Sequence, residues 1–249
     1  MRTKFKFPRG AAFFAVFSAA LLLVLSPRPA LSEEKTRAVL FREDFHTLSQ
    51  WTPVYFPRIE RHSTYAAVVK DGLPMLEARS DRSASAIRWV KDYDAALYPR
   101  LRWLWKIEHV YEKGDETKKS GDDYALRVYV MFRYDPAKAS AWQRLRYGAA
   151  KTLYGQYPPG SALLYIWSNK PHEKRILTSP YADNVKMVIL ETGNSKAGQW
   201  IVEDVNVLAD YRAAFGKEPG SPASLAVMND SDNTGEASVS WLQWIEISR

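Results

Sequence analysis

The sequence contains no cysteine, which excludes a disulfide framework, a thiolate nucleophile and a metal site built on thiolates. It also lacks a G-x-S-x-G elbow, a phosphate-binding loop, a dinucleotide fingerprint and an H-E-x-x-H pair. No resident cofactor is therefore expected, apart from the calcium ion considered below. Nothing local in the sequence specifies catalysis, so we favour a protein that is not an enzyme. The four histidines also show no metal-binding spacing, at His46, His62, His109 and His172.

The sequence has few features of a membrane span, although it starts with an apolar run. Basic residues between Arg2 and Arg9 precede the run from Ala11 to Leu25, which is too short for a good span. Ala30-Leu31-Ser32 then resembles a cleavage site with small residues at its key positions. We expect residues 1–32 to be a cleaved signal peptide, and the mature protein to be periplasmic or secreted without a stable membrane span. The alternative is an uncleaved N-terminal anchor.

The net positive charge is small once this segment is removed. The whole chain has a formal charge of +7, and residues 1–32 hold five basic residues and no acid, which leaves +2 for the rest. A strongly basic surface is the electrostatic mark of nucleic-acid binding, and the mature chain does not have one on average. We therefore expect no nucleic-acid partner.

The clearest predicted strand runs from Gly121 to Tyr134. Its residues alternate with the period of two expected of a strand with one face in a core and the other partly in water. Asp135-Pro136 ends it. The predicted core face holds Tyr124, Leu126, Val128, Val130 and Phe132, and the opposite face holds Arg127, Tyr129, Met131 and Arg133.

The rest of the chain is also predicted to be mostly β. Asp71-Gly72 indicates a hairpin, and two segments have helical character, Ala137–Tyr154 and Leu208–Phe215, the second stopped by Gly216. About ten strands with one or two short inserted helices predict a single all-β domain over residues 33–249, an antiparallel two-sheet β-sandwich of jelly-roll type. The other predicted strands are 38–41, 52–56, 65–70, 75–79, 84–90, 101–110, 163–167, 185–191, 200–207, 225–228 and 238–247.

Aromatic and charged side chains share the less apolar faces of several strands. On the last strand, alternation places Trp244 and Glu246 opposite Trp241, Ile245 and Ile247. An aromatic ring beside hydrogen-bonding groups suits a sugar, because CH groups stack on the ring while hydroxyls find polar partners. The alternative is that these aromatics fill a core. The predicted ligand-binding residues are Arg127, Tyr129, Arg133, Trp200, Trp244 and Glu246. Of these, Arg127, Tyr129, Trp244 and Trp200 are expected to line one groove.

The loop from Asp230 to Glu236 begins like an EF-hand, yet its twelfth position is Trp241 where a glutamate is needed. A looser calcium site built on Asp230 and Asp232 is left open beside a plain polar turn. Adjacent acids also occur at Asp122-Asp123 and elsewhere. Neighbours on a strand point to opposite faces, so no such pair forms a glycosidase site alone, and we expect these acids to be solvated.

Several segments taken together resemble a family of exported bacterial proteins known only as a domain of unknown function. They are Arg127-Val-Tyr-Val-Met-Phe, Leu164-Tyr-Ile-Trp-Ser, the run from Val188 to Gly216, and Met228-Asn-Asp-Ser-Asp-Asn-Thr-Gly-Glu-Ala. A weaker likeness, at Asp44-Phe45 and Trp51, is to jelly-roll carbohydrate-binding modules; it implies a galactose-binding-like or concanavalin-like sandwich. Those modules place an acid in the last strand that Gln243-Trp244-Ile245 lacks.

Three functions follow from these observations. The first is a non-catalytic binding module for a glycan or another cell-envelope ligand. The second is a glycan hydrolase or lyase whose site is assembled from separate strands, which needs two acids facing each other across a cleft. The third is a structural or assembly partner in the cell envelope, favoured if the outward aromatics form a flat patch and not a groove.

Overall fold

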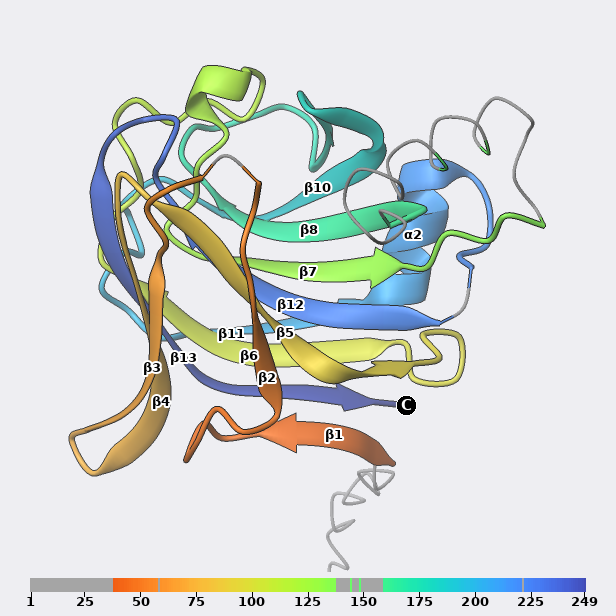
Figure 1. Cartoon of the computed structure of the whole chain (residues 1–249), viewed down its shortest axis with the longest axis horizontal. Helices are drawn as coiled ribbons and strands as arrows, with labels where there is room; N and C mark the ends of the chain where they lie inside the picture. Colours follow the sequence, from red (N-terminus) through yellow and green to blue (C-terminus); the bar gives the residue numbers. More distant parts are fainter. Residues whose placement is uncertain (1–37, 58, 138–143, 145–147, 149–158, 221) are drawn as a thin grey trace, which may run out of the picture. The chain divides into compact units, whose positions relative to one another are not determined.

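The computed structural model describes residues 38–137 without 58, residues 144 and 148, and residues 159–249 without 221. Six of the described strands form one sheet, in the order β11-β6-β13-β4-β3 with β1 beside β13 (Figure 1). They are β1 (Val39–Glu43), β3 (Thr64–Lys70), β4 (Leu73–Asp81), β6 (Arg100–Ile107), β11 (Ile201–Asn206) and β13 (Ala237–Ser248).

Seven of the described strands form the second sheet, in the order β2-β5-β12-β7-β8-β10-β9. The two sheets make a β-sandwich, as predicted. One detail of that prediction is wrong, because β10 runs parallel to β8, so the seven-stranded sheet is mixed. Its strands are β2 (Trp51–Val54), β5 (Ala84–Tyr93), β7 (Arg127–Phe132), β8 (Ser161–Ser168), β9 (Ile176–Ser179), β10 (Ala182–Thr192) and β12 (Ala223–Asp230).

The core lies between the sheets and is rich in aromatic rings. On β6 the inward residues Trp103 and Trp105 are both 0% exposed, and their rings lie 5.6 Å from the rings of Tyr165 and Trp167 on β8. Large aromatic side chains bury the most apolar area per residue, and tilted ring pairs add about 0.5–1.5 kcal/mol each. This packing stabilises a chain that has no disulfide to hold it.

The predicted strand from Gly121 begins later than expected, at Arg127, and its strand β7 is the middle strand of the seven-stranded sheet. Leu126, Val128 and the following core-facing residues lie in the main core, as predicted. Tyr124 does not. Tyr124 precedes the strand, so the alternation of inward and outward side chains along β7 does not fix its direction. It packs in a second cluster with Met187. Its hydroxyl donates to Asp122 Oδ1 at 3.0 Å.

A bulge in β13 corrects a second expectation. Leu242 and Trp244 face the consecutive residues Trp105 and Leu104 of β6, which leaves Gln243 as an extra residue. An extra residue resets the alternation of a strand. As a result Trp241 and Trp244 lie on the same outer face of the six-stranded sheet, where strict alternation would have separated them.

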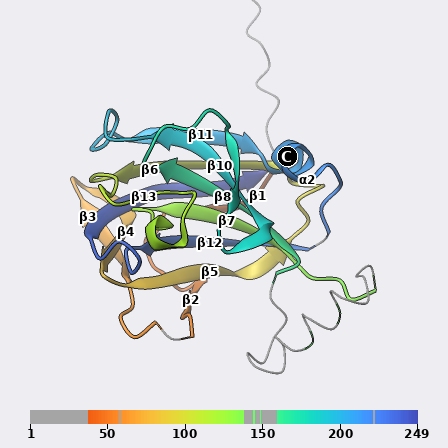
Figure 2. The same cartoon turned by 90° about the horizontal axis from the view of Figure 1, so that it is seen from above.

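The helix α2 (Val207–Phe215) confirms the predicted short helix and packs against both sheets, at β8 and β11 (Figure 2). Asn206 caps its first turn by accepting from the Ala209 amide at 2.9 Å. Gly216 ends it at φ 65°, a left-handed conformation that glycine adopts without strain. The helix predicted over 137–154 falls almost entirely outside the described residues.

Val128 tests the central position of β7. It is 0% exposed and lies between β12 and β8, so Val128→Asp would bury a carboxylate without a partner. We expect a loss of about 3 kcal/mol or more in the free energy of unfolding, measured by urea denaturation. The matched control is Val202→Asp on the edge strand β11, where the side chain is 52% exposed. Equal stability of the two variants would contradict the assignment of β7 to the core.

Candidate ligand-binding site

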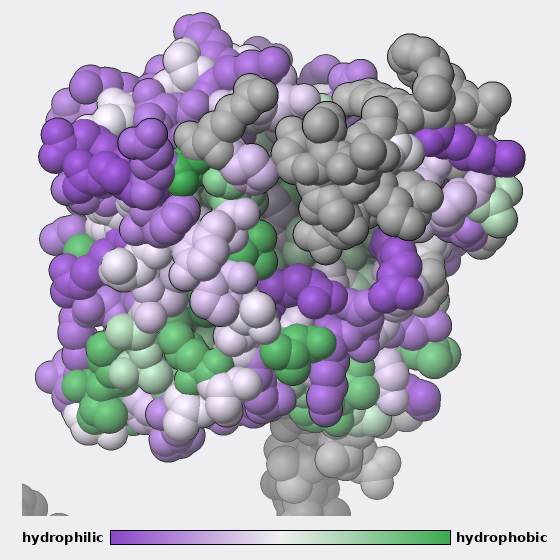
Figure 3. Space-filling model, viewed as in Figure 1, coloured by the Kyte–Doolittle hydropathy of each residue, from purple (hydrophilic) through white to green (hydrophobic). Residues whose placement is uncertain are grey.

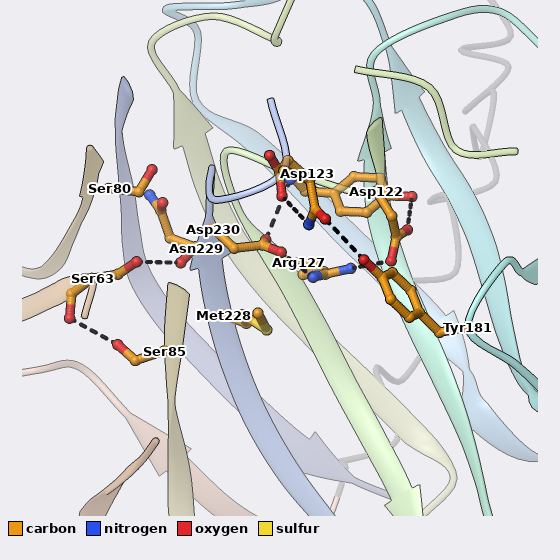
Figure 4. A network of polar contacts seen from close by, with 12 residues as sticks. Ser63, Ser80, Ser85, Asp122, Asp123, Arg127, Tyr181, Met228, Asn229 and Asp230 are labelled. Carbon is orange, nitrogen blue, oxygen red and sulfur yellow. Dashed lines mark hydrogen bonds and ion pairs between the residues drawn. The ribbon is translucent and has the colours of Figure 1, made fainter. Parts of the chain in front are cut away.

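A buried guanidinium organises the outer face of the seven-stranded sheet (Figure 4). Arg127 is only 4% exposed, which corrects the expectation that this face of the strand is partly wet. Its Nη2 donates to Asp230 Oδ2, and its Nη1 lies 3.6 Å from Asp122 Oδ2. The guanidinium also lies over the rings of Tyr124 and Tyr129, at 4.7 and 5.5 Å. These contacts compensate a charge that could not otherwise be buried.

More acid gathers here than Arg127 can neutralise. Carboxylate oxygens of Asp123, Asp230 and Asp232 lie within 4.8 Å of one another, and Asp122 is close by. Burial raises the pKa of Asp122, Asp230 and Asp232, and repulsion from neighbouring carboxylates adds to the rise. Asp122 and Asp123 are 5% and 0% exposed, so the expectation that this acidic pair is solvated is wrong.

The cluster adds Asp123 to the two predicted calcium ligands. Both oxygens of Asp123 already accept hydrogen bonds, from Asn233 Nδ2 at 3.0 Å and from the Thr234 amide at 2.6 Å. Asp230 likewise accepts from the Tyr124 amide and from Arg127. These hydrogen bonds fix the loop from Asp230 to Glu236 without a metal ion, as expected if the loop is a plain polar turn. Calcium binding at Asp230 and Asp232 stays a prediction.

Asn229 connects the acidic cluster to the other sheet. It stands next to Asp230 at the end of β12, and its Nδ2 donates to Ala78 O at 3.3 Å and to Ser240 Oγ at 3.2 Å. The main-chain carbonyl of Asn229 accepts a hydrogen bond from Ser63 Oγ at 2.7 Å. The polar network in Figure 4 therefore runs from Ser63, Ser80 and Ser85 on one side to Arg127 and Tyr181 on the other.

Two hollows lie beside this network. One lies between β2 and β3, the edge strands of their sheets, and the other extends from the start of β3 across the neighbouring ends of β4, β13 and β6. His62 and Thr64 line both of them, so the hollows adjoin. The polar pocket has a volume of about 580 Å³ and is lined by Arg61, His62, Thr64, Arg79, Ser80, Asp81, Ser83, Glu108, His109, Ala237, Ser238 and Val239. The aromatic pocket has a volume of about 330 Å³ and is lined by Leu48, Trp51, Pro53, Tyr55, His62, Ser63, Thr64, Tyr65, Ser85, Ala86 and Ile87.

An exposed ring marks the entrance to the aromatic pocket. Tyr55 is 60% exposed, and its ring centroid lies 4.3 Å from that of His62. In the polar pocket, Asp81 pairs with Arg61 at 2.8 Å and with Arg82 at 3.0 Å. The hydrogen bond from Arg82, with the nearby charge of Arg61, lowers the pKa of Asp81, so this carboxylate is ionised at neutral pH. The pair of pockets thus joins an aromatic ring to charged hydrogen-bonding groups.

Apolar surface on this side of the molecule collects elsewhere. Figure 3 shows it at the lower left, over the hairpin between β3 and β4. Val69 and Leu73 there are 71% and 50% exposed. Thr64, which lines the pockets, begins β3, whereas Val69 lies near the other end of that strand. The apolar tip is therefore separate from the two pockets.

The structure separates the predicted ligand-binding residues into two groups. Arg127, Tyr129 and Arg133 belong to the outer face of the seven-stranded sheet, where Arg133 is exposed and pairs with Asp92 at 2.6 Å. Trp244 and Glu246 lie on the outer face of the six-stranded sheet, and Trp200 precedes its edge strand β11. Opposite faces of a sandwich cannot line one groove, so the prediction of a single groove is wrong.

Sequence reasoning missed the pocket residues. It placed Tyr55 in a predicted strand over 52–56, whereas β2 ends at Val54 and the connection that follows, which includes Arg61, has no periodicity. It also treated Asp122-Asp123 as surface acids. One signal was available: an arginine inside a strongly alternating apolar strand requires carboxylate partners once both faces are covered. The adjacent acids at 122 and 123 were the nearest candidates.

Comparison with known proteins identifies the family. A family model described as "Protein of unknown function (DUF3047)" matches residues 49–246. The chain belongs to this family. Membership confirms the resemblance drawn from the sequence, and it assigns no activity to DUF3047 proteins. The comparison with curated proteins finds no match.

Among solved structures, this DUF3047 chain is similar to the family 30 carbohydrate-binding module of a cellulosomal cellulase from Clostridium thermocellum, with 11% identity and a TM-score of 0.36 over 85% of this chain and 92% of that one. It is also similar to the xyloglucanase domain of a type three effector from Sinorhizobium fredii, with 10% identity and a TM-score of 0.41 over 80% and 93%. A third is endoglucanase 3 of Trichoderma harzianum, with 7% identity and a TM-score of 0.41 over 86% and 98%. These are likenesses of architecture.

Glu203 carries the pH dependence that is easiest to test. Burial, with repulsion from Glu191, raises the pKa of Glu203 from the ordinary 4.5 to about 7, although Trp105 Nε1 donates to it at 3.1 Å. Between pH 4.5 and 7 the folded state therefore keeps a proton that the unfolded state has lost, so stability falls as the pH rises. The neutral carboxyl is the form that suits the folded protein.

We therefore expect Glu203→Gln to be more stable than the parent at pH 8 by about 1–3 kcal/mol, and nearly equal to it at pH 5, because each pKa unit corresponds to about 1.4 kcal/mol. Gln keeps an oxygen that can accept from Trp105. Urea denaturation at the two pH values measures the difference, with Glu60→Gln at an exposed position as the control. A pH-independent difference between parent and Glu203→Gln would contradict the raised pKa.

Proposed function

We propose that this DUF3047 protein is a non-catalytic module that binds a glycan of the cell envelope in the groove formed by the polar and aromatic pockets. One observation carries the proposal: the two pockets adjoin at His62 and Thr64. A concave site with apolar walls and a few convergent polar groups is the usual form of a small-ligand site. An aromatic ring beside hydrogen-bonding groups is also the combination expected from the sequence, although the residues proposed here are different ones.

The aromatic pocket supplies surfaces for the CH faces of a sugar. Tyr55 and His62 present neighbouring rings at its entrance, and Trp51, which is 6% exposed, lies deeper. The indole N–H of Trp51 is already used, because it donates to Glu43 Oε2 at 3.2 Å. Trp51 therefore forms part of the wall, and the exposed ring of Tyr55 is the group that a ligand can stack against.

The polar pocket supplies hydrogen-bonding groups for hydroxyls. Arg61 Nη2 donates a hydrogen bond to Asp81 Oδ2, and the guanidinium keeps further N–H donors that a sugar hydroxyl can accept from. Ser80 and Ser238 bond to each other and to Tyr111, so they form a fixed wall of the pocket. A sugar unit stacked on Tyr55 would extend its next unit past His62 toward these groups.

Tyr55→Ala tests the site. We expect it to lose about five- to thirty-fold in affinity for the oligosaccharide that the parent binds best on a glycan array, since stacking on one ring contributes roughly 1–2 kcal/mol. Titration calorimetry measures the affinity, and the melting temperature should stay within about 2 °C because the ring is exposed. The matched control is Tyr181→Ala, a 52% exposed tyrosine beside the Arg127 network. Loss of binding in Tyr181→Ala alone would move the site to that face, and a blank array with folded parent would overturn the proposal.

A hydrolase is the second candidate, and one observation favours it: Asp81 and Glu108 both line the polar pocket. The low pKa of Asp81 suits a nucleophile or a base, whereas a glycosidase also needs a protonated acid opposite it. Release of new reducing ends during the binding experiments would establish hydrolysis. Its loss in Asp81→Asn would assign the nucleophile or base.

Export of the protein is part of the proposal and rests on residues 1–32. No helix among the described residues is long and apolar enough to cross a membrane. We expect the protein recovered from the periplasm or medium to begin at Glu33. Mass spectrometry of its N-terminal peptide measures this, and recovery of intact Met1 in the membrane fraction would contradict it.

A further inference from the structure

The outer face of the six-stranded sheet carries two rows of alternating cations and indoles. In the first row Lys106 Nζ lies 4.8 Å from the Trp200 ring and 4.6 Å from the Trp241 ring, and Lys70 Nζ lies 4.5 Å from Trp241. This row crosses the sheet from the β11 margin to β3. We call it the lysine row.

The second row lies further along β6 and β13. The guanidinium carbons of Arg42 and Arg102 lie 4.7 and 5.8 Å from the Trp244 ring. Arg102 and Lys106 are four residues apart on β6, so the two rows are separated by about 13 Å at the usual rise of a strand. We call this the arginine row. The bulge at Gln243 is what allows Trp241 and Trp244 to share the face.

Carboxylates beneath the rows hold the cations in place. Glu77 Oε2 lies 2.6 Å from Lys70 Nζ and accepts a hydrogen bond from Trp241 Nε1 at 3.0 Å. Glu77 Oε1 lies 2.7 Å from Arg79 Nε. Burial opposes the ionised form, yet these hydrogen bonds lower the pKa of Glu77 to about 2. In the arginine row, Glu246 Oε2 lies 3.3 Å from Arg42 Nη1, and Glu246 Oε1 lies 4.0 Å from Arg102 Nη1.

The two kinds of charge lie at different depths. The Glu77 and Glu246 side chains are 11% and 10% exposed, whereas those of Lys70, Arg79 and Arg42 are 42%, 54% and 40% exposed. A partner approaching this face therefore meets cations first, with indole rings between them. Exposed acids also occur on this face. Asp44 and Asp204, at 45% and 32%, each pair with arginine, and Asp81 and Glu108, at 53% and 54%, lie beyond the lysine row at the end of the strands.

We propose that the lysine row and the arginine row form a second docking surface, for an acidic polysaccharide that bears carboxylates. Charge complementarity favours an anionic partner, and the half-buried indoles suit the CH faces of sugar rings. The surface extends over several strands, as an extended chain requires. It lies away from Tyr55 and meets the polar pocket at Arg79, which lines that pocket and also pairs with Glu77.

Polygalacturonate is the probe, with neutral dextran as its uncharged counterpart. We expect the parent protein to bind immobilised polygalacturonate but not dextran, and to be released by salt because exposed charges are screened. The double variant Lys70→Gln/Lys106→Gln should bind at least about ten-fold more weakly, a loss of about 1.4 kcal/mol. The control Lys119→Gln/Arg133→Gln makes the same change of charge at exposed positions outside both rows and should bind like the parent.

Two outcomes would overturn the proposal: no binding of polygalacturonate by the folded parent, or equal weakening in both double variants. Binding of phosphatidylglycerol vesicles or single-stranded DNA in preference to polygalacturonate would also overturn it, in favour of a lipid surface or a nucleic acid. Tyr55→Ala should bind polygalacturonate like the parent. This separates failure of the docking surface from failure of the groove.

Discussion

Apolar burial between two twisted sheets is the constraint on which this structure depends. No disulfide exists to assist it, so the layer of rings around Trp103, Trp105, Tyr165 and Trp167 supplies the stabilisation. Such rings fill the space between sheets only if each strand keeps its inward register. The positions of every outward side chain follow from this requirement, including those of the candidate sites.

At one end of the sandwich, buried polar groups also connect the two sheets. Asn229 reaches from β12 to Ala78 and Ser240 of the other sheet, and Asp230 beside it pairs with Arg127. A fully buried network of this kind specifies one arrangement of the two sheets, because a shifted register would leave buried donors and acceptors unpaired. The network also supplies the serines that line the two pockets. Asn229 of β12 therefore contacts both the opposite sheet and Ser63, which lines the aromatic pocket.

The two proposed surfaces differ in their chemistry because they lie on different parts of the fold. The groove lies at the margin where the edge strands β2 and β3 leave the sheets open, and it combines rings with a few fixed charges. The outer face of the six-stranded sheet is broad, and the polar pocket meets it at Arg79. Its indoles are held by cations, and its acids lie beneath them. A concave site suits a short ligand, and a broad face suits a long one.

Periodicity alone determined much of this protein. The alternation of Val128 and Val130 identified a central strand, and the spacing from Leu208 to Gly216 identified α2, because both signals are local. The number and alternation of the strands indicated the class of fold. The order of several motifs indicated a family known only as a domain of unknown function, which the family model identifies as DUF3047. Tertiary structure alone decided which strands share a sheet. That decision placed Arg127 and Trp244 on opposite faces, buried Asp122 and Asp123, and formed the pockets around His62, since pairing between distant strands leaves no trace in the local pattern.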